Sequence, residues 1–181
     1  ATPTPLVFVI HGGGWQGGEK ERVNRFVNVE GLLAKGISVV SINYRLGPLG
    51  FLAQRDLRGE APDHPQSGNY GLLDQVAALA WVRANIAAFG GDPQRVTVYG
   101  ESAGGVSSCV LLATPAASGL FQRAISESGG ISIEATQRLT EPVGRFKALE
   151  QDGLDFAASL NIANDEQAPD KLRALSVAQI L

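Results

Sequence analysis

The sequence holds no methionine, one cysteine and two histidines among its 181 residues. A single cysteine, Cys109, excludes a disulfide within the chain, and cysteine usage therefore leaves the redox compartment open. The net charge is only −3, which provides neither a basic field for nucleic acid nor a polybasic patch for a membrane surface. No apolar run reaches the roughly 18 residues that mark a membrane span, so we expect no transmembrane helix.

Methionine is absent even at position 1, and Ala1 stands only a few residues before an apolar run typical of a core strand. The chain stops at Leu181, just after an apolar pattern has begun and without a helix-stop signal. These features predict a segment truncated at both ends, so that targeting signals and localisation stay unknown. The 44% share of apolar residues is that of an ordinary globular domain.

Runs of apolar and β-branched residues predict four short strands. They cover residues 6–10, 37–44, 95–99 and 123–126. Apolar residues at helical spacing predict helices between and after these strands. The helices cover residues 21–35, 70–89 and 103–113, with small outlying helices at residues 134–146, 154–160 and 170–175. Strands that alternate with helices predict an α/β fold with a parallel sheet and right-handed crossovers.

Two further expectations concern the segments around the strands. The proline-containing residues 45–68 predict an extended surface loop. The helix at residues 70–89 is apolar nearly all round, so we expect it to lie against the sheet and under other elements.

The sequence Gly100-Glu101-Ser102-Ala103-Gly104 lies between a predicted strand and a helix of small residues. With 22 glycines in the chain, the bare G-x-S-x-G pattern is a weak signal. The strand–turn–helix context makes it typical of a nucleophile elbow, in which the sharp turn exposes the serine Oγ. Glycines two positions before and after the serine relieve the crowding of the backbone there. Ser102 is therefore the predicted nucleophile.

The five residues His11-Gly12-Gly13-Gly14-Trp15 follow the first predicted strand. Consecutive glycines leave backbone N–H groups bare, so that a substrate oxygen can approach them closely. Such a loop supplies one half of an oxyanion hole, and the first N–H groups of the helix after the elbow supply the other. Loop and elbow together are far more specific than either pattern alone, and they indicate a serine hydrolase.

Further motifs, long enough to be specific to one protein family, extend these two patterns along nearly the whole chain. They cover residues 11–15, 41–47, 50–52, 68–75, 81–86, 89–93, 96–105 and 124–129. In these motifs the chain resembles the type-B carboxylesterases, which include the cholinesterases and bacterial para-nitrobenzyl esterases. The resemblance implies an α/β-hydrolase fold, with a mostly parallel sheet and helices on both faces. The predicted strands then match the third to sixth of that fold, in the spatial order second, first, third, fourth.

The resemblance also implies how the domain is organised and which residues act on the substrate. Residues 1–181 would form one partial domain, with the core sheet and elbow in residues 1–130 and peripheral helices in residues 131–181. A small-molecule carboxylic ester would acylate Ser102, and the oxyanion would accept hydrogen bonds from the N–H groups of Gly13, Gly14 and Ala103. The resemblance implies neither a cofactor nor a metal.

Four further residues are candidates for the surroundings of the nucleophile. The resemblance places Glu101 in the pocket, in a polar network that Ser128 joins, and an orienting role is favoured over direct chemistry. His11 adjoins the glycine loop and, in the family pattern, shapes it. For Trp15, lining the substrate pocket and simple packing beside the loop both stay open.

The general base is missing from the predicted constellation. In the family an acid and then a histidine follow the serine, whereas His11 and His64 both precede Ser102. His64 lies among prolines and is expected to be a solvated loop residue. We therefore expect the acid and the histidine beyond Leu181, in the remainder of the same chain, and expect the 181 residues alone to be inactive.

Two alternatives compete with this interpretation. Gly12, Gly14 and Gly17 also match a dinucleotide-binding fingerprint. That site needs a helix that opens among the glycines and an acidic residue at the end of the next strand, where this chain has Asn43 and Tyr44. The second alternative is a non-catalytic carboxylesterase-like fragment or interaction protein. The intact Ser102 disfavours it for the parent protein, and it stays open for the 181 residues alone.

Overall fold

The computed structural model describes residues 2–58, 67–131, 137–144 and 146–181. The chain divides into two compact units. One consists of residues 1–44 and 72–131, and the other of residues 45–71 and 132–181. Residues 45–71 therefore group with the C-terminal part of the chain, whereas the sequence placed them with the core sheet. His64 lies outside the described residues.

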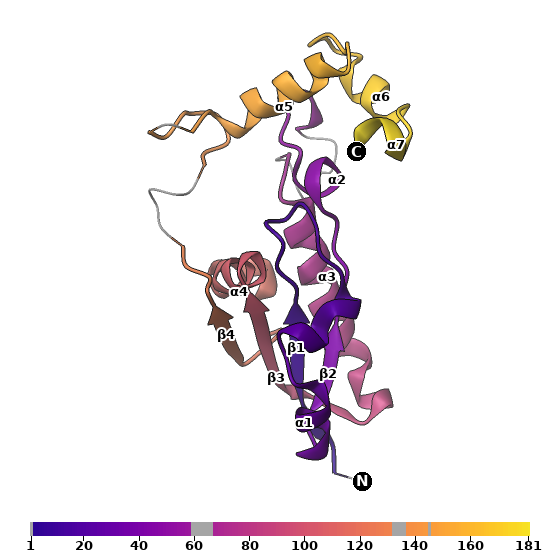
Figure 1. Ribbon diagram of the computed structural model, residues 1–181, viewed down its shortest axis with the longest axis vertical. Helices are drawn as coiled ribbons and strands as arrows, with labels where there is room; N and C mark the ends of the chain where they lie inside the picture. The colour runs from indigo at the N-terminus through magenta and orange to yellow at the C-terminus, as the bar shows by residue number, and fades with distance from the viewer. Residues whose placement is uncertain (1, 59–66, 132–136, 145) are drawn as a thin grey trace. The chain divides into compact units, whose positions relative to one another are not determined.

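Four parallel strands form the sheet of the first unit. They are β1 (Thr4–Ile10), β2 (Ser38–Ser41), β3 (Gly91–Glu101) and β4 (Arg123–Glu127). Their order is β2-β1-β3-β4 (Figure 1), and the register places Phe8 opposite Val40 on one side and Val98 on the other. The predicted fold class and strand order are confirmed, although β3 extends beyond the predicted range at both ends.

The two central strands, β1 and β3, bury side chains on both faces, as central strands of a parallel sheet with crossover helices do. Leu6, Phe8 and Val98 are almost completely buried on one face. On the other face Val9 and Tyr99 pack with Val27, which lies just before helix α1 (Val29–Ala34). Helix α4 (Ala103–Ala113) packs against β1, β3 and β4.

The predicted helix over residues 21–35 is wrong as a single element. A 3₁₀ helix, η1 (Lys20–Arg25), is separated from α1 by a break at residues 26–28. The Asn28 side chain accepts a hydrogen bond from the Gly31 N–H at 2.9 Å and so starts a new helix. Asparagine competes with a continuous helix by capping, and valines and a glycine lower the helix propensity further.

The predicted helix over residues 70–89 is confirmed as α3 (Tyr70–Asn85) followed by the 3₁₀ helix η3 (Ile86–Phe89). Gly90, with φ of 82°, ends it in the left-handed conformation that glycine adopts without strain. Only one face is buried, since Trp81 is 50% exposed and Phe89 70%. The prediction that this helix lies under other elements on nearly all its sides is therefore wrong for the described residues.

The 20 residues from Tyr70 to Phe89 are long and apolar enough to cross a membrane by length and composition, and 22% of an 18-residue window within them is buried. The sequence analysis had expected no such span. Core helices of globular proteins meet the same criterion, and Gln75 within this span is completely buried. One such helix therefore gives no membrane assignment.

The second unit contains short helices. They are α2 (Gly47–Phe51), η2 (Arg55–Leu57), α5 (Leu149–Ser159), α6 (Ala168–Arg173) and α7 (Val177–Ile180). The extended loop predicted over residues 45–68 is wrong where it is described, because Gln54 and Ser67 are buried and the Gln54 N–H donates to Ser67 Oγ at 2.9 Å. An ion pair between Arg58 and Glu150 ties this segment to α5.

The helix predicted over residues 134–146 is not formed in its described part. An isolated antiparallel bridge joins Val143 to Phe146 there. The small helices predicted at residues 154–160 and 170–175 are confirmed as α5 and α6, with α5 beginning five residues earlier, at Leu149.

Candidate active site

Ser102 occupies a sharp turn between the end of β3 and the start of α4. Its backbone has φ of 55° and ψ of −120°, a combination that residues with a side chain rarely adopt. Such a conformation costs about 1–3 kcal/mol and persists only where its surroundings enforce it. Strain of this kind at a strand–helix turn is a mark of a nucleophile elbow.

The glycines around Ser102 show what enforces the turn. A Cβ added to Gly100 would lie 2.0 Å from the Gly104 oxygen, and one added to Gly104 would lie 2.1 Å from the Ile10 oxygen. Both obstacles are backbone atoms, which cannot rotate away as a side chain can. The spacing of glycines in the motif therefore follows from close contacts between β1, β3 and α4.

Two backbone hydrogen bonds hold Ser102 itself. Its N–H donates to the Glu127 carbonyl at the end of β4, at 2.9 Å, and its carbonyl accepts from the Val106 N–H, also at 2.9 Å. That second bond is the first of helix α4, so the N–H groups of Ala103, Gly104 and Gly105 have no acceptor within the helix. Ala103, the predicted oxyanion donor after the serine, is the first residue of this helix.

The glycine loop follows β1 and turns back on itself. Gly13 and Gly14 have φ of 111° and 62°, and even Trp15 has φ of 58°. The Gly13 carbonyl accepts hydrogen bonds from the N–H groups of Gln16 and Gly17, each at 3.1 Å. A Cβ on Gly13 would lie 2.2 Å from the Gly17 oxygen, whereas one on Gly14 would meet nothing within 4 Å.

The loop and the elbow touch at Gly12. A Cβ placed on Gly12 would lie 2.7 Å from the Glu101 backbone oxygen and 3.2 Å from the Ser102 Cβ. Two segments far apart in the sequence are therefore in direct contact, as the hypothesis of a shared oxyanion hole requires. Only a residue without a side chain fits at this contact.

His11 is buried and fixed at the start of the loop. Its Nδ1 lies 2.8 Å from the Gly12 carbonyl oxygen, to which it donates when protonated there. Its ring stacks on Tyr44 with 4.5 Å between ring centroids, and the Tyr44 hydroxyl donates to the His11 carbonyl at 2.7 Å. Burial raises the pKa of Tyr44 to about 12, so the hydroxyl keeps its proton.

Trp15 is held by a hydrogen bond to a buried hydroxyl. Its Nε1–H donates to the Ser107 hydroxyl at 3.2 Å, and Gln75 Nε2 donates to the same oxygen at 3.3 Å. The Ser107 and Gln75 side chains are completely buried, and α4 and α3 thus contact the loop through this one hydroxyl. The geometry gives Trp15 an anchoring contact; whether it also lines a substrate pocket stays a prediction.

Glu101 and Ser128 are not joined by any contact that the structure describes. Glu101 is the last residue of β3 and lies opposite Glu127 of β4. Ser128 follows Glu127, is exposed and has φ of 50°. The polar network implied for these two residues stays a prediction.

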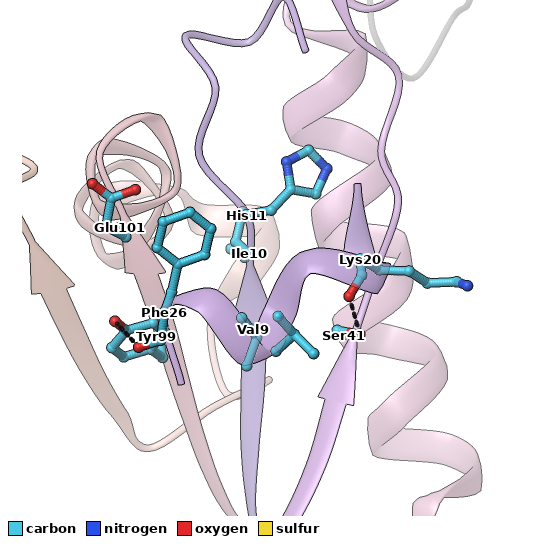
Figure 2. A pocket seen from close by; sticks show the side chains of 9 residues that line it. Val9, Ile10, His11, Lys20, Phe26, Ser41, Tyr99 and Glu101 are labelled. Carbon is cyan, nitrogen blue, oxygen red and sulfur yellow. Dashed lines mark hydrogen bonds between the residues drawn. The ribbon is translucent and has the colours of Figure 1, made fainter. Parts of the chain in front are cut away.

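A small cavity of about 10 Å³ lies beside the end of β1, room for about one water molecule. Figure 2 shows its walls, formed by β1, β2, β3 and the η1 segment. They are Val9, Ile10, His11, Lys20, Val23, Phe26, Ser41, Tyr99 and Glu101. Because the cavity is small and Ser102 does not line it, it is not a substrate pocket. Over the described ranges, no three His, Cys, Asp or Glu side chains are grouped to hold a metal ion.

Sequence reasoning missed four residues that support the predicted ones: Gln75, Tyr99, Ser107 and Glu127. The available signals were weak. Gln75 is a polar residue in an otherwise apolar helical stretch, and Ser107 stands among small residues, where a serine is unremarkable. The contact between Tyr44 and His11 is identified only by the fold.

The parallel sheet, the strained serine between strand and helix, and the glycine loop against it together define a protein of the α/β-hydrolase fold. The sequence model of the "Carboxylesterase family" matches residues 1–181. The chain belongs to the carboxylesterase family.

Individual relatives agree with this assignment. The chain is 44% identical over 179 residues to a para-nitrobenzyl esterase of Bacillus subtilis, covering 98% of this chain and 32% of that protein. It is 41% identical over 157 residues to a fumonisin B1 esterase of Sphingopyxis macrogoltabida, covering 87% and 27%. A solved carboxylesterase of Geobacillus stearothermophilus superposes with a TM-score of 0.85 at 38% identity, covering 99% and 35%. The chain thus spans about a third of the length of such relatives.

Proposed function

We propose that residues 1–181 carry the nucleophile and the oxyanion donors of a serine carboxylic-ester hydrolase. The observation that carries this proposal is the strained Ser102 with the glycine loop packed directly against it. The names of the related esterases support a carboxylic ester as substrate, without indicating which one. The proposal needs neither a metal nor a cofactor.

The reaction follows from the chemistry of an activated serine. Ser102 Oγ attacks the ester carbonyl carbon while its proton passes to a histidine base, and the carbonyl oxygen becomes an oxyanion. N–H groups of Gly13, Gly14 and Ala103 donate to that oxygen, each contributing about 3–4 kcal/mol to the transition state. The tetrahedral intermediate expels the alcohol with the proton from the histidine, and water then hydrolyses the acyl-enzyme.

The base must come from outside residues 1–181. The sequence contains two histidines, both before Ser102, and His11 is buried with Nδ1 engaged by the Gly12 carbonyl. We propose that the acid and the histidine belong to a longer polypeptide that includes these residues. Residues 1–181 alone should then show only the residual rate that oxyanion and binding contacts support.

The test uses the full-length polypeptide that the proposal requires. A fluorophosphonate should label Ser102, and Ser102→Ala should abolish both labelling and turnover of short-chain p-nitrophenyl esters. Ser108→Ala is a matched control, because this buried serine of α4 donates to the Gly104 carbonyl and lies outside the proposed chemistry. Unchanged turnover in Ser102→Ala would refute the assignment. Absence of any esterase activity in the folded wild type would instead favour a non-catalytic member of the family.

A further inference from the structure

The Tyr99 side chain reaches diagonally across the sheet from β3 to β4. The register places Tyr99 opposite Ile125 and Glu101 opposite Glu127. Alternate residues of a strand share a face, so Tyr99 and Glu127 are diagonal neighbours, within reach of an aromatic side chain. The Tyr99 hydroxyl donates to Glu127 Oε2 at 2.8 Å.

Glu127 contacts the elbow through a different atom. Its backbone carbonyl accepts the Ser102 N–H at 2.9 Å. This bond lies at the strained residue itself, whose φ of 55° must be enforced by its surroundings. One residue therefore binds the nucleophile with its main chain and Tyr99 with its side chain.

The position of Glu127 explains why a second attachment matters. It is the last residue of β4, the exposed strand at one end of the described sheet order. Strand ends open more readily than strand centres, because fewer contacts hold them. The Glu127 carbonyl can therefore hold the strained turn at Ser102 only weakly unless a second contact fixes Glu127.

Tyr99 is well suited to fix Glu127, because Tyr99 is itself firmly packed. It is 7% exposed and packs with Val9 and Val27 in the cluster between the sheet and the η1–α1 segment. Its oxygen also lies 3.2 Å from the Phe26 carbonyl, which shares the single hydroxyl proton with the nearer Glu127. Burial, together with the hydrogen bond to Glu127, raises the pKa of Tyr99 to about 12, so the hydroxyl remains a donor at neutral pH.

We propose that Tyr99 and Glu127 are positioning residues that fix the end of β4, so that the Glu127 carbonyl holds Ser102 in its reactive backbone conformation. The proposal rests on the proposed function of Ser102 as nucleophile. Neither side chain needs to touch the substrate.

The first test is Tyr99→Phe in the full-length polypeptide, which keeps the buried ring and removes only the hydroxyl. We expect kcat to fall about fivefold, the factor that one ordinary hydrogen bond supports, with KM changed less than about twofold. The rate of fluorophosphonate labelling should fall in parallel. Exchange of the Ser102 amide hydrogen, followed on peptides spanning residues 99–106, should accelerate.

Variants at the partner residue give a matched series. Glu127→Gln keeps an acceptor oxygen for the tyrosine, and should preserve most of the wild-type kcat. Glu127→Ala removes that acceptor and should resemble Tyr99→Phe. The double variant Tyr99→Phe/Glu127→Ala should be no slower than either single variant, because both remove the same interaction. Tyr70→Phe is the control for loss of a hydroxyl, since Tyr70 lies in the other unit, where its ring contacts Arg45.

The exchange measurement separates this proposal from the proposed function, because it needs no turnover. Faster exchange at Ser102 in Tyr99→Phe, with wild-type exchange in Tyr70→Phe, supports positioning even if Ser102→Ala were to retain activity. Unchanged exchange and unchanged kcat in Tyr99→Phe would overturn it. Multiplicative effects of Tyr99→Phe and Glu127→Ala in the double variant would also contradict it.

Discussion

The elbow around Ser102 and the glycine loop after β1 are in contact, but they are stabilised in different ways. At the elbow, backbone atoms fill the space where side chains of Gly100 and Gly104 would lie. In the loop, backbone oxygens also fill the space at Gly12 and Gly13, but the space around Gly14 and Gly17 is open. Contacts of the His11 and Trp15 side chains hold this segment. The elbow is therefore held by close packing, whereas the part of the loop around Gly14 and Gly17 is held by a few hydrogen bonds and one ring stack.

This difference predicts which half tolerates change. Substitution at the elbow should disturb the packing of β1, β3 and α4 and so lower the stability of the fold. Substitution at Gly14 should leave the fold largely intact and alter the geometry of the N–H groups proposed as oxyanion donors, which lowers kcat. The following predictions apply to the full-length polypeptide and run from the largest expected effect to the smallest.

Gly104→Ala should have the largest effect. Its Cβ would lie 2.1 Å from the Ile10 carbonyl oxygen, a backbone atom of the central sheet. Overpacking of this kind typically costs about 1–3 kcal/mol, and we expect at least about 3 kcal/mol because the backbone must move. Urea denaturation measures the loss. A wild-type midpoint for this variant would show that α4 is not packed as tightly as described.

Gly14→Ala is the same chemical change made in the loop. The added methyl meets nothing within 4 Å, but φ of 62° costs a residue with a side chain about 1–2 kcal/mol. We expect a folded protein with a reduced kcat, because relief of the strain moves the N–H groups proposed as oxyanion donors.

Gly17→Ala provides the control within the same loop. It also has open space and does not require a left-handed backbone, so the alanine should be neutral or stabilise the fold by about 0.4–1 kcal/mol. Steady-state kinetics of both variants measure the contrast. Equal kcat values for Gly14→Ala and the wild type would mean that the oxyanion donors lie elsewhere.

Tyr44→Phe tests the attachment at the start of the loop. It removes the hydroxyl that donates to the His11 carbonyl and keeps the ring that stacks on His11. Loss of one buried hydrogen bond costs about 1–3 kcal/mol when the partner stays unsatisfied. We expect a modest loss of stability with a several-fold loss of kcat. Loss of stability alone, at unchanged kcat, would show that Tyr44 supports the fold and not the loop.

The last effect is absent at neutral pH, appears only in alkali, and involves one tyrosine from each half. Tyr44 and Tyr99 have pKa values raised to about 12 from the ordinary 10, chiefly by burial. The unfolded chain loses these protons first, so the folded state binds more protons between pH 10 and 12, and the free energy of unfolding falls as pH rises through that window. Tyrosinate absorbance should show one late-titrating group fewer in Tyr44→Phe and in Tyr99→Phe. Titration of either residue near pH 10 in the folded protein would contradict this.

The strand order, the elbow and the glycine loop could be predicted because their sequence signals are local or belong to long motifs that are specific to the family. β-branched runs mark strands, and G-x-S-x-G between a strand and a helix specifies a turn. Local propensity failed at residues 21–35, where Asn28 capped a second helix, and at residues 45–68, where prolines suggested a loop although Gln54 and Ser67 are buried.

The supports of the site could not be predicted from the sequence. The contacts Tyr44–His11, Trp15–Ser107 and Tyr99–Glu127 join residues 33, 92 and 28 positions apart. They depend on strand register and on the path of the loop, which a one-dimensional pattern does not specify. Each involves a residue whose single-position signal is that of ordinary packing. The candidate nucleophile, Ser102, was thus identifiable before the structure, and the groups that hold it were not.

The most direct test of the central claim is to trap the covalent intermediate on Ser102. An aryl carbamate should carbamoylate the full-length protein, because the carbamoyl-enzyme hydrolyses slowly, and peptide mass spectrometry locates the added group. The account predicts stoichiometric modification of Ser102, none in Ser102→Ala, and slower modification in Gly14→Ala at unchanged fold. Carbamoylation of a different residue, with release of the phenol undiminished in Ser102→Ala, would contradict it.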